Sequence, residues 1–162
     1  MTAGTIAPFV AHLQSRTALT EEELAEILAA FRMKKIKKKQ FIIQPEFIAK
    51  HRSYVLQGAF RGYVIDEKGE DHTIQFAIED WWISDYNSYI YQQPATMFVV
   101  ALEDSIIMQI DHESEQQLKS ANHKFETLFR IMAERAAAFQ QRRVISNLTQ
   151  SAEERYYHFL ER

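Results

Sequence analysis

Five aromatic side chains lie close together in the sequence, at Trp81, Trp82, Tyr86, Tyr89 and Tyr91. Such a group could form one wall of a pocket for an aromatic ligand, because ring faces and edges bind planar molecules well. The same side chains could instead belong to a hydrophobic core, which is the commoner place for clustered rings. The segment is therefore interpreted either as a ligand pocket or as part of the core.

Residue types that perform other chemistry are scarce or badly spaced. The chain has no cysteine, and its six histidines show neither the His-x-His nor the His-Glu-x-x-His spacing of common metal sites. It has only four glycines, none after Gly69, so a phosphate-binding glycine loop is excluded. No grouping of Ser, His and Asp or of paired carboxylates follows from local spacing. We therefore expect no metal, no cofactor and no enzyme activity.

Charge is distributed unevenly along the 162 residues. Residues 69–118 contain ten acidic residues and no Lys or Arg, so this block is expected to present an acidic wall that disfavours anions. The run Lys34–Lys39 contains five lysines. It could bind nucleic acid, but its alternation favours a solvated strand at a sheet edge.

The N-terminal residues have the apolar spacing of a helix. One apolar face is formed by Ile6, Phe9, Val10 and Leu13. A second helix is predicted over residues 21–31, because Thr20 and Glu23 form a capping box in front of an apolar stripe.

The period changes to two between Met33 and Ile110, which predicts strands joined by short turns. Within this region, residues 85–93 have the composition of a short helix or ordered loop. The predicted strands are Gln40–Ile43, Ser53–Gln57, Phe60–Ile65, Thr73–Ile78, Thr96–Leu102 and Ile106–Ile110.

The chain then returns to helix, first around residues 112–120 and then over residues 122–148 without Gly or Pro. The second helix would be about 40 Å long, longer than one small domain needs. It carries an apolar seam that predicts a parallel homodimer, formed by Phe125, Leu128, Met132 and Phe139. A second capping box, Ser151 with Glu154, opens a final helix.

This order of elements resembles the Crp/Fnr superfamily of bacterial transcription regulators. The resemblance rests on four segments: Lys38–Ile43 entering a roll, Tyr54–Tyr63 around Gly58, Ile78–Asp85 before the ligand cassette, and Ser151–Tyr156 as the start of a linker helix. It implies an α+β fold, in which a jelly-roll (double-stranded β-helix) domain of the cyclic-nucleotide-binding type has N-terminal helices and a long C-terminal dimerisation helix.

The resemblance also implies a division of the chain. Residues 1–120 would form the effector domain, residues 121–150 the dimerisation helix, and residues 151–162 the start of a linker to a DNA-binding domain absent from this chain. The expected partners are a second copy and an unknown small-molecule effector, with DNA bound only through that further domain. No apolar run is long enough to cross a membrane and no signal peptide is evident, so the cytoplasm is expected.

In family members that bind cyclic nucleotides, a Gly-Glu pair is followed by an Arg that binds the phosphate. Ser84 and Asp85 take the place of the pair, and Gln92–Thr96 contains no cation where the Arg would lie. Cyclic AMP is therefore not the expected effector. The alternative is a cupin-like β-barrel that binds small molecules or acts as an enzyme. The candidate ligand-binding residues are Trp82, Ser84, Asp85, Tyr86, Ala95, Thr96, Gln140 and Gln141.

Overall fold

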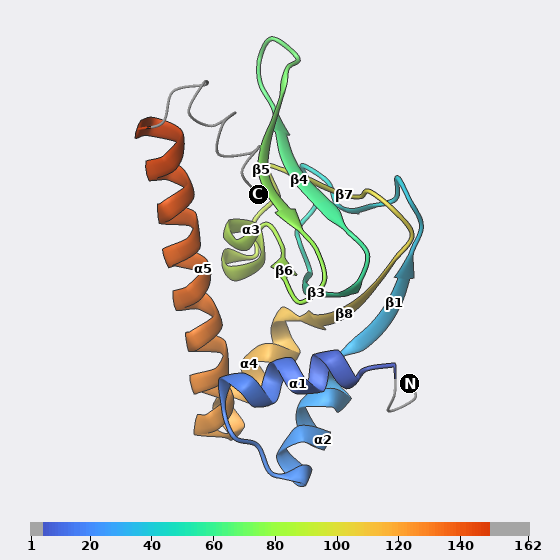
Figure 1. Ribbon diagram of the computed structural model, residues 1–162, viewed down its shortest axis with the longest axis vertical. Helices are drawn as coiled ribbons and strands as arrows, with labels where there is room; N and C mark the ends of the chain where they lie inside the picture. Colours follow the sequence, from blue (N-terminus) through green and yellow to red (C-terminus); the bar gives the residue numbers. More distant parts are fainter. Residues whose placement is uncertain (1–4, 150–162) are drawn as a thin grey trace, which may run out of the picture.

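The computed structural model describes residues 5–149, in which helices flank a roll of antiparallel strands (Figure 1). The expected linker helix at residues 151–162 lies outside this range. The helices are α1 (Ala7–Arg16), α2 (Glu21–Ala30), α3 (Tyr86–Tyr91), α4 (His112–Ala121) and α5 (His123–Thr149). The strands are β1 (Arg32–Ile36), β2 (Phe41–Ile43), β3 (His51–Gln57), β4 (Phe60–Ile65), β5 (Asp71–Ala77), β6 (Trp82–Ile83), β7 (Phe98–Ala101) and β8 (Ser105–Asp111).

The strands form two antiparallel sheets of four, with the orders β1-β8-β3-β6 and β2-β7-β4-β5. All six strands predicted from the sequence occur. Their inward side chains form one core between the sheets, which includes Val55, Phe60, Ile83, Val99 and Ile107. The two sheets therefore enclose the roll interior.

Strands β3 and β8 are buried on both faces. Val55 and Ile107 point into the roll, while their neighbours Tyr54 and Met108 belong to a second core beneath the helices. Tyr54 and Met108 are paired across the two strands. This strand pair therefore forms a wall shared by the roll and the helical layer.

The helical layer is joined by the predicted capping box of α2. The Thr20 hydroxyl accepts from the Glu23 amide, and the Glu23 carboxylate accepts from the Thr20 amide. Glu23 also accepts from Lys124 and Asn122 at 2.8 and 2.7 Å. These hydrogen bonds, the one from Lys124 most strongly, lower the pKa of Glu23 to about 2. The carboxylate thus connects the start of α2 to the start of α5.

Two strands were not among the six predicted segments. Strand β1 lies at a sheet edge, where Lys34 and Lys35 are exposed, which confirms the edge-strand interpretation of the lysine run. Strand β6 has only two residues and pairs with β3 through Trp82 and Ile83. So short a strand has no periodicity of its own to detect.

We predict that Gly58→Ala lowers the free energy of unfolding by about 2–4 kcal/mol, from overpacking added to backbone strain. Gly58 has φ +109°, and a Cβ there would lie 2.0 Å from the Ser105 hydroxyl oxygen. Gly69→Ala is the control, because Gly69 has φ +83° but open space around it. Urea unfolding should show a clearly larger loss for Gly58→Ala, and equal losses would contradict the steric argument.

Candidate functional site

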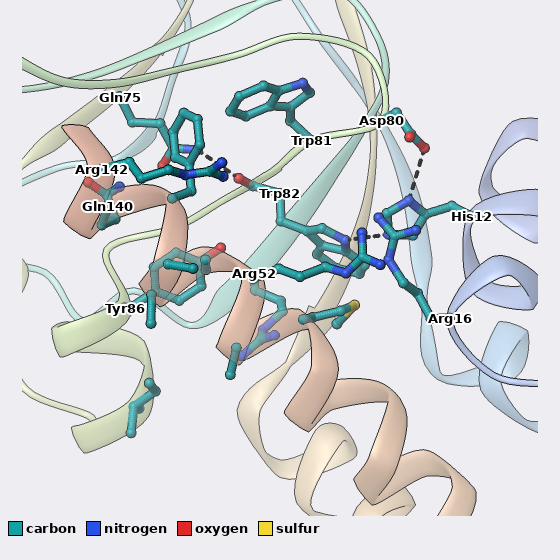
Figure 2. Close-up of a pocket in the computed structure, with 18 residues that line it drawn as sticks. His12, Arg16, Arg52, Gln75, Asp80, Trp81, Trp82, Tyr86, Gln140 and Arg142 are labelled. Carbon is teal, nitrogen blue, oxygen red and sulfur yellow. Dashed lines mark hydrogen bonds and ion pairs between the residues drawn. The ribbon is translucent and has the colours of Figure 1, made fainter. Parts of the chain in front are cut away.

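A cavity of about 660 Å³ lies between α5 and the β-roll, a size suited to a small organic molecule (Figure 2). It is bounded by α1, β3, the β5–β6 region, α3 and the middle of α5. The side chains that line it are His12, Arg16, Arg52, Gln75, Asp80, Trp81, Trp82, Tyr86, Ile90, Met132, Ala133, Arg135, Ala136, Ala137, Ala138, Phe139, Gln140 and Arg142.

Three of the five clustered rings, Trp81, Trp82 and Tyr86, line this cavity. Tyr89 is fully buried in the roll core, and Tyr91 is largely exposed. Phe139 of α5 meets Trp81 edge-on, with ring centroids 5.0 Å apart. The aromatic segment therefore serves as both cavity wall and core.

A tight turn before β6 presents the two tryptophans. Asp80 has a left-handed backbone (φ +75°), and its amide donates to the Val55 carbonyl. The Val55 amide in turn donates to the Trp81 carbonyl at 2.8 Å. The turn is thus held on β3, next to the helical layer.

A hydrogen-bond network joins α1 to this turn. Trp82 Nε1 donates to His12 Nε2 at 2.9 Å, so His12 Nδ1 carries the proton that it donates to Asp80, also at 2.9 Å. The Tyr54 hydroxyl donates to the same Asp80 oxygen at 2.7 Å. Burial lowers the pKa of His12, opposed by the charge of Asp80. The ring is therefore neutral at neutral pH.

The cavity is lined by four arginines, Arg16, Arg52, Arg135 and Arg142, and only one carboxylate, Asp80. The expectation of an acidic wall is therefore wrong for this cavity. That expectation considered residues 69–118 alone, whereas the four cations come from α1, β3 and α5. In Figure 2, Arg142 and Arg16 lie at opposite ends of the drawn site, with Trp82 between them.

Arg52 is the most buried of these cations. Its Nε lies 3.0 Å from Glu115 Oε1, in an ion pair without good hydrogen-bond geometry. Its guanidinium also lies over the rings of Tyr86, Tyr89 and Phe129, 5.4 to 5.5 Å from their centroids. Arg52 thereby connects β3 with α3, α4 and α5. No local motif in the sequence indicates this long-range contact.

The structure brings only three of the eight candidate ligand-binding residues to the cavity: Trp82, Tyr86 and Gln140. Ser84 is buried and donates to the His51 carbonyl. Ala95 is buried in the roll core, and Thr96 is exposed outside the cavity. Gln141 is also exposed and does not line the cavity.

Asp85 has a structural task. One carboxylate oxygen accepts from the Ser88 amide and caps α3, and the other accepts from the Thr96 amide at 2.9 Å. Both oxygens are thus engaged within the cassette segment itself. Asp85 therefore holds the loop after α3 in place. On the sequence alone, this residue is a candidate for ligand binding.

Three of the four proposed seam residues, Phe125, Leu128 and Met132, are buried in the core beneath the roll. Phe139 packs on Trp81 at the cavity. These side chains are used within the chain, so their assignment to a dimer seam is corrected. The apolar side chains of α5 that remain exposed are Val144, Ile145 and Leu148, at 55, 51 and 80%.

One group of possible metal ligands occurs among residues 5–149, at Asp66, Glu70 and His72. It lies on the exposed turn between β4 and β5. Asp66 accepts from the Lys68 and Glu70 amides and pairs with His72 at 2.7 Å. These three residues therefore stabilise the turn of the β4–β5 hairpin.

No protein-family model and no curated protein matches the chain. Solved structures do match it. A catabolite activator protein from Thermus thermophilus has a TM-score of 0.65 at 18% identity, over 83% of this chain and 63% of that one. The sensor domain of the transcriptional regulator DNR from Pseudomonas aeruginosa has a TM-score of 0.67 at 14% identity, over 87 and 94%.

A third match is the c-di-GMP-responsive global regulator CLP of Xanthomonas campestris, with a TM-score of 0.70 at 11% identity. It covers 88% of this chain and 71% of that one. Identities this low show the fold alone, and they confirm the α+β roll predicted from the sequence. The chain spans less than two thirds of the length of the Thermus protein.

We predict that the free energy of unfolding falls as the pH drops below about 6.5, the model-compound pKa of histidine. Because burial lowers the pKa of His12 in the folded state, the unfolded state binds the proton first. His12→Gln should reduce this pH dependence. His51, whose pKa burial also lowers, contributes equally to both proteins. Urea unfolding between pH 7.5 and 5 measures the free energy of unfolding. The same pH dependence in wild type and in His12→Gln would contradict the assignment to His12.

Proposed function

We propose that this chain, which has the cyclic-nucleotide-binding β-roll fold of Crp/Fnr-type regulators, is the effector-sensing and dimerisation region of such a transcription regulator. The observation that carries the proposal is the cavity between the roll and α5. A molecule bound there contacts both parts at once. A ligand in this site can therefore change the position of the long helix relative to the roll.

The proposed mechanism is a shift between positions of α5. The first turns of α5 are fixed by Phe125, Leu128 and Met132 in the core. Beyond them, its described contacts with the roll include Phe139 on Trp81 and a hydrogen bond from Arg143 to the Ile74 carbonyl. An effector that binds one position of this upper half more tightly shifts the population toward it.

We place the dimer contact on the outward face of the upper half of α5. Val144, Ile145 and Leu148 are exposed there, and an apolar face on a long helix is stabilised when a second copy covers it. The homodimer remains the proposed assembly, with these side chains in place of the seam named from the sequence. Reorientation of α5 would then change the geometry of the pair.

We assign DNA binding to a domain beyond the described residues. The matched Thermus protein is longer than the aligned region. Sequence-specific readout needs an element in the major groove, and the lysines of β1 serve here as a solvated sheet edge. No helix in residues 5–149 is long and apolar enough to cross a membrane. We propose a cytoplasmic regulator without enzyme activity.

A cupin-like enzyme is the less favoured alternative. Cupin chemistry needs histidine and carboxylate metal ligands that converge inside the barrel. The acid–histidine group of residues 5–149 lies instead on an exposed hairpin turn. The roll interior between the sheets is filled mainly by apolar side chains.

The experiment compares transcript levels in wild type and in a deletion strain under different growth conditions. We predict that Ala136→Trp, introduced into the full-length gene, abolishes the condition-dependent differences that wild type shows. Ala136 lines the cavity, and an indole ring there fills space that an effector needs. Ala121→Trp is the control, because Ala121 is exposed at the end of α4 and does not line the cavity. An unaltered transcript response in Ala136→Trp would contradict the proposed function.

We predict a homodimer at about tens of micromolar, a usual range for modest coiled-coil seams. Replacing both Ile145 and Leu148 with Glu should give monomers in sedimentation velocity, because two buried like charges per helix oppose pairing. Ile65→Glu is the control, as Ile65 is 51% exposed, like Ile145, but lies on the roll. A monomeric wild type, or a dimer that survives the double change, would disprove this contact.

We predict no low-micromolar binding of cyclic AMP or cyclic GMP in isothermal titration. Asp85 is buried, accepts from two backbone amides and does not line the cavity, so it is poorly placed for a ribose hydroxyl. The cassette segment from residue 84 to 96 offers no Lys or Arg to the phosphate. A saturating heat signal at low micromolar concentration for either nucleotide would contradict this prediction.

A further inference from the structure

Of the four arginines that line the cavity, Arg52 is paired with Glu115, whereas two others have no such partner. Arg16 and Arg135 form no ion pair with a carboxylate within residues 5–149. Arg16 donates to the Ser15 hydroxyl, and its Nε is buried without a partner. Both residues line the cavity, Arg16 as a half-buried side chain of α1 and Arg135 as an exposed one of α5.

The two guanidinium groups act on the same region of the cavity. Both side chains line the cavity together with His12, whose pKa burial lowers most, Asp80 raises, and the two arginine charges lower further. Among residues 5–149, Asp80 is the one acidic residue that lines the cavity, and it accepts hydrogen bonds from His12 and Tyr54. Arg16 and Arg135 together carry one more charge than Asp80 balances, so the described lining here has a net positive charge.

The rest of the wall is aromatic and apolar. Trp82 lies beside this cationic end, and Figure 2 shows Tyr86 on the far side of Trp82 from Arg16. The facing surface of α5 contributes alanines and Phe139. The two amide side chains of the wall are Gln75, which already donates to the Trp82 carbonyl at 3.0 Å, and Gln140. A ring-bearing molecule with few hydroxyl groups fits such a wall better than a nucleotide.

We propose that the cavity binds a ring-bearing apolar molecule with one anionic group, the anion held by Arg16 and Arg135 and the rings packed against Trp82 and Tyr86. This inference rests on the proposed function and names the ligand class for the same cavity. The anionic group is a carboxylate or a phosphate, either of which pairs with guanidinium.

Binding of this ligand bridges two helices. Arg16 belongs to α1 and Arg135 to α5, so an anion held by both side chains contacts the two helices at once. The aromatic contacts add the β5–β6 turn and α3 to the same cluster. The ligand thereby fixes α5 against the roll, which is the motion that the proposed mechanism needs.

The test compares two dyes with the same kind of ring body. The anionic probe is 1-anilinonaphthalene-8-sulfonate, and the neutral probe is N-phenyl-1-naphthylamine. Energy transfer from the cavity tryptophans reports binding at this site, because both Trp81 and Trp82 line it and the chain has no other tryptophan. Titrations use the folded chain at neutral pH.

The decisive variant is Arg16→Gln with Arg135→Gln. It should weaken binding of the anionic dye at least tenfold and change the dissociation constant of the neutral dye less than twofold. The matched control is Arg130→Gln, which removes one charge from α5 at an exposed position paired with Glu134. Arg142→Gln removes a cavity cation at the opposite end and should have a smaller effect. Thermal unfolding of each variant confirms that the fold is retained.

The outcomes separate the two proposals. Equal weakening of the binding of both dyes, or none, would overturn the anion assignment. The cavity stays a ligand site if Ala136→Phe, which fills it without adding a tryptophan, abolishes the energy transfer. Energy transfer that Ala136→Phe leaves intact would instead count against the cavity and the proposed function. Competition by 1-naphthoate or by 1-naphthyl phosphate then identifies the anionic group, and displacement by neither would contradict the ligand class.

Discussion

The anchoring of α5 in the helical core is the constraint on which the rest of the structure depends. Phe125, Leu128, Phe129 and Met132 are buried beneath the β3–β8 wall, where they complete a core that α1 and α2 alone could not close. Burial of several large apolar side chains contributes about 1.5–3 kcal/mol each, which fixes the first turns of α5 firmly. An α-helix is stiff, so this anchorage directs the remaining turns along the roll (Figure 1). The cavity lies between these turns and the roll.

A buried ion pair supports the same junction from inside. Arg52 and Glu115 come from β3 and α4, and Glu115 also accepts from the Tyr89 hydroxyl of α3 and pairs with Lys119. Because both charges are desolvated, removal of Glu115 leaves the buried Arg52 without its carboxylate, at a cost of about 3–5 kcal/mol, whereas Glu115 without Arg52 keeps Lys119. The pair therefore adds little net stability over apolar packing, but it fixes the positions of α3 and α4 relative to the roll.

Local patterns predicted most of the fold, because helices and strands of ordinary length carry their own period. The capping box at Thr20, the hairpin strands and the long helix all occur where the sequence placed them. The site was predicted less well. Asp85 and Ser84 are engaged in backbone hydrogen bonds that no spacing indicates, and the apolar seam of α5 faces its own core. An apolar stripe on a helix shows that something covers it, but not whether the cover is the same chain or a second copy.

The same distinction explains why the charge of the cavity could not be inferred from the acidic block. Electrostatic interactions act across space, and the cations at the cavity are separated from residues 69–118 by whole strands and helices in sequence. The anchored half of α5 leaves its upper half with few contacts of its own, while Arg135 and Arg142 sit on the turns that cross the cavity. A helix with a fixed base and unneutralised charge along its middle is sensitive to whatever occupies the space beside it. In the proposed function, a ligand in the cavity therefore acts on the position of the far end of α5.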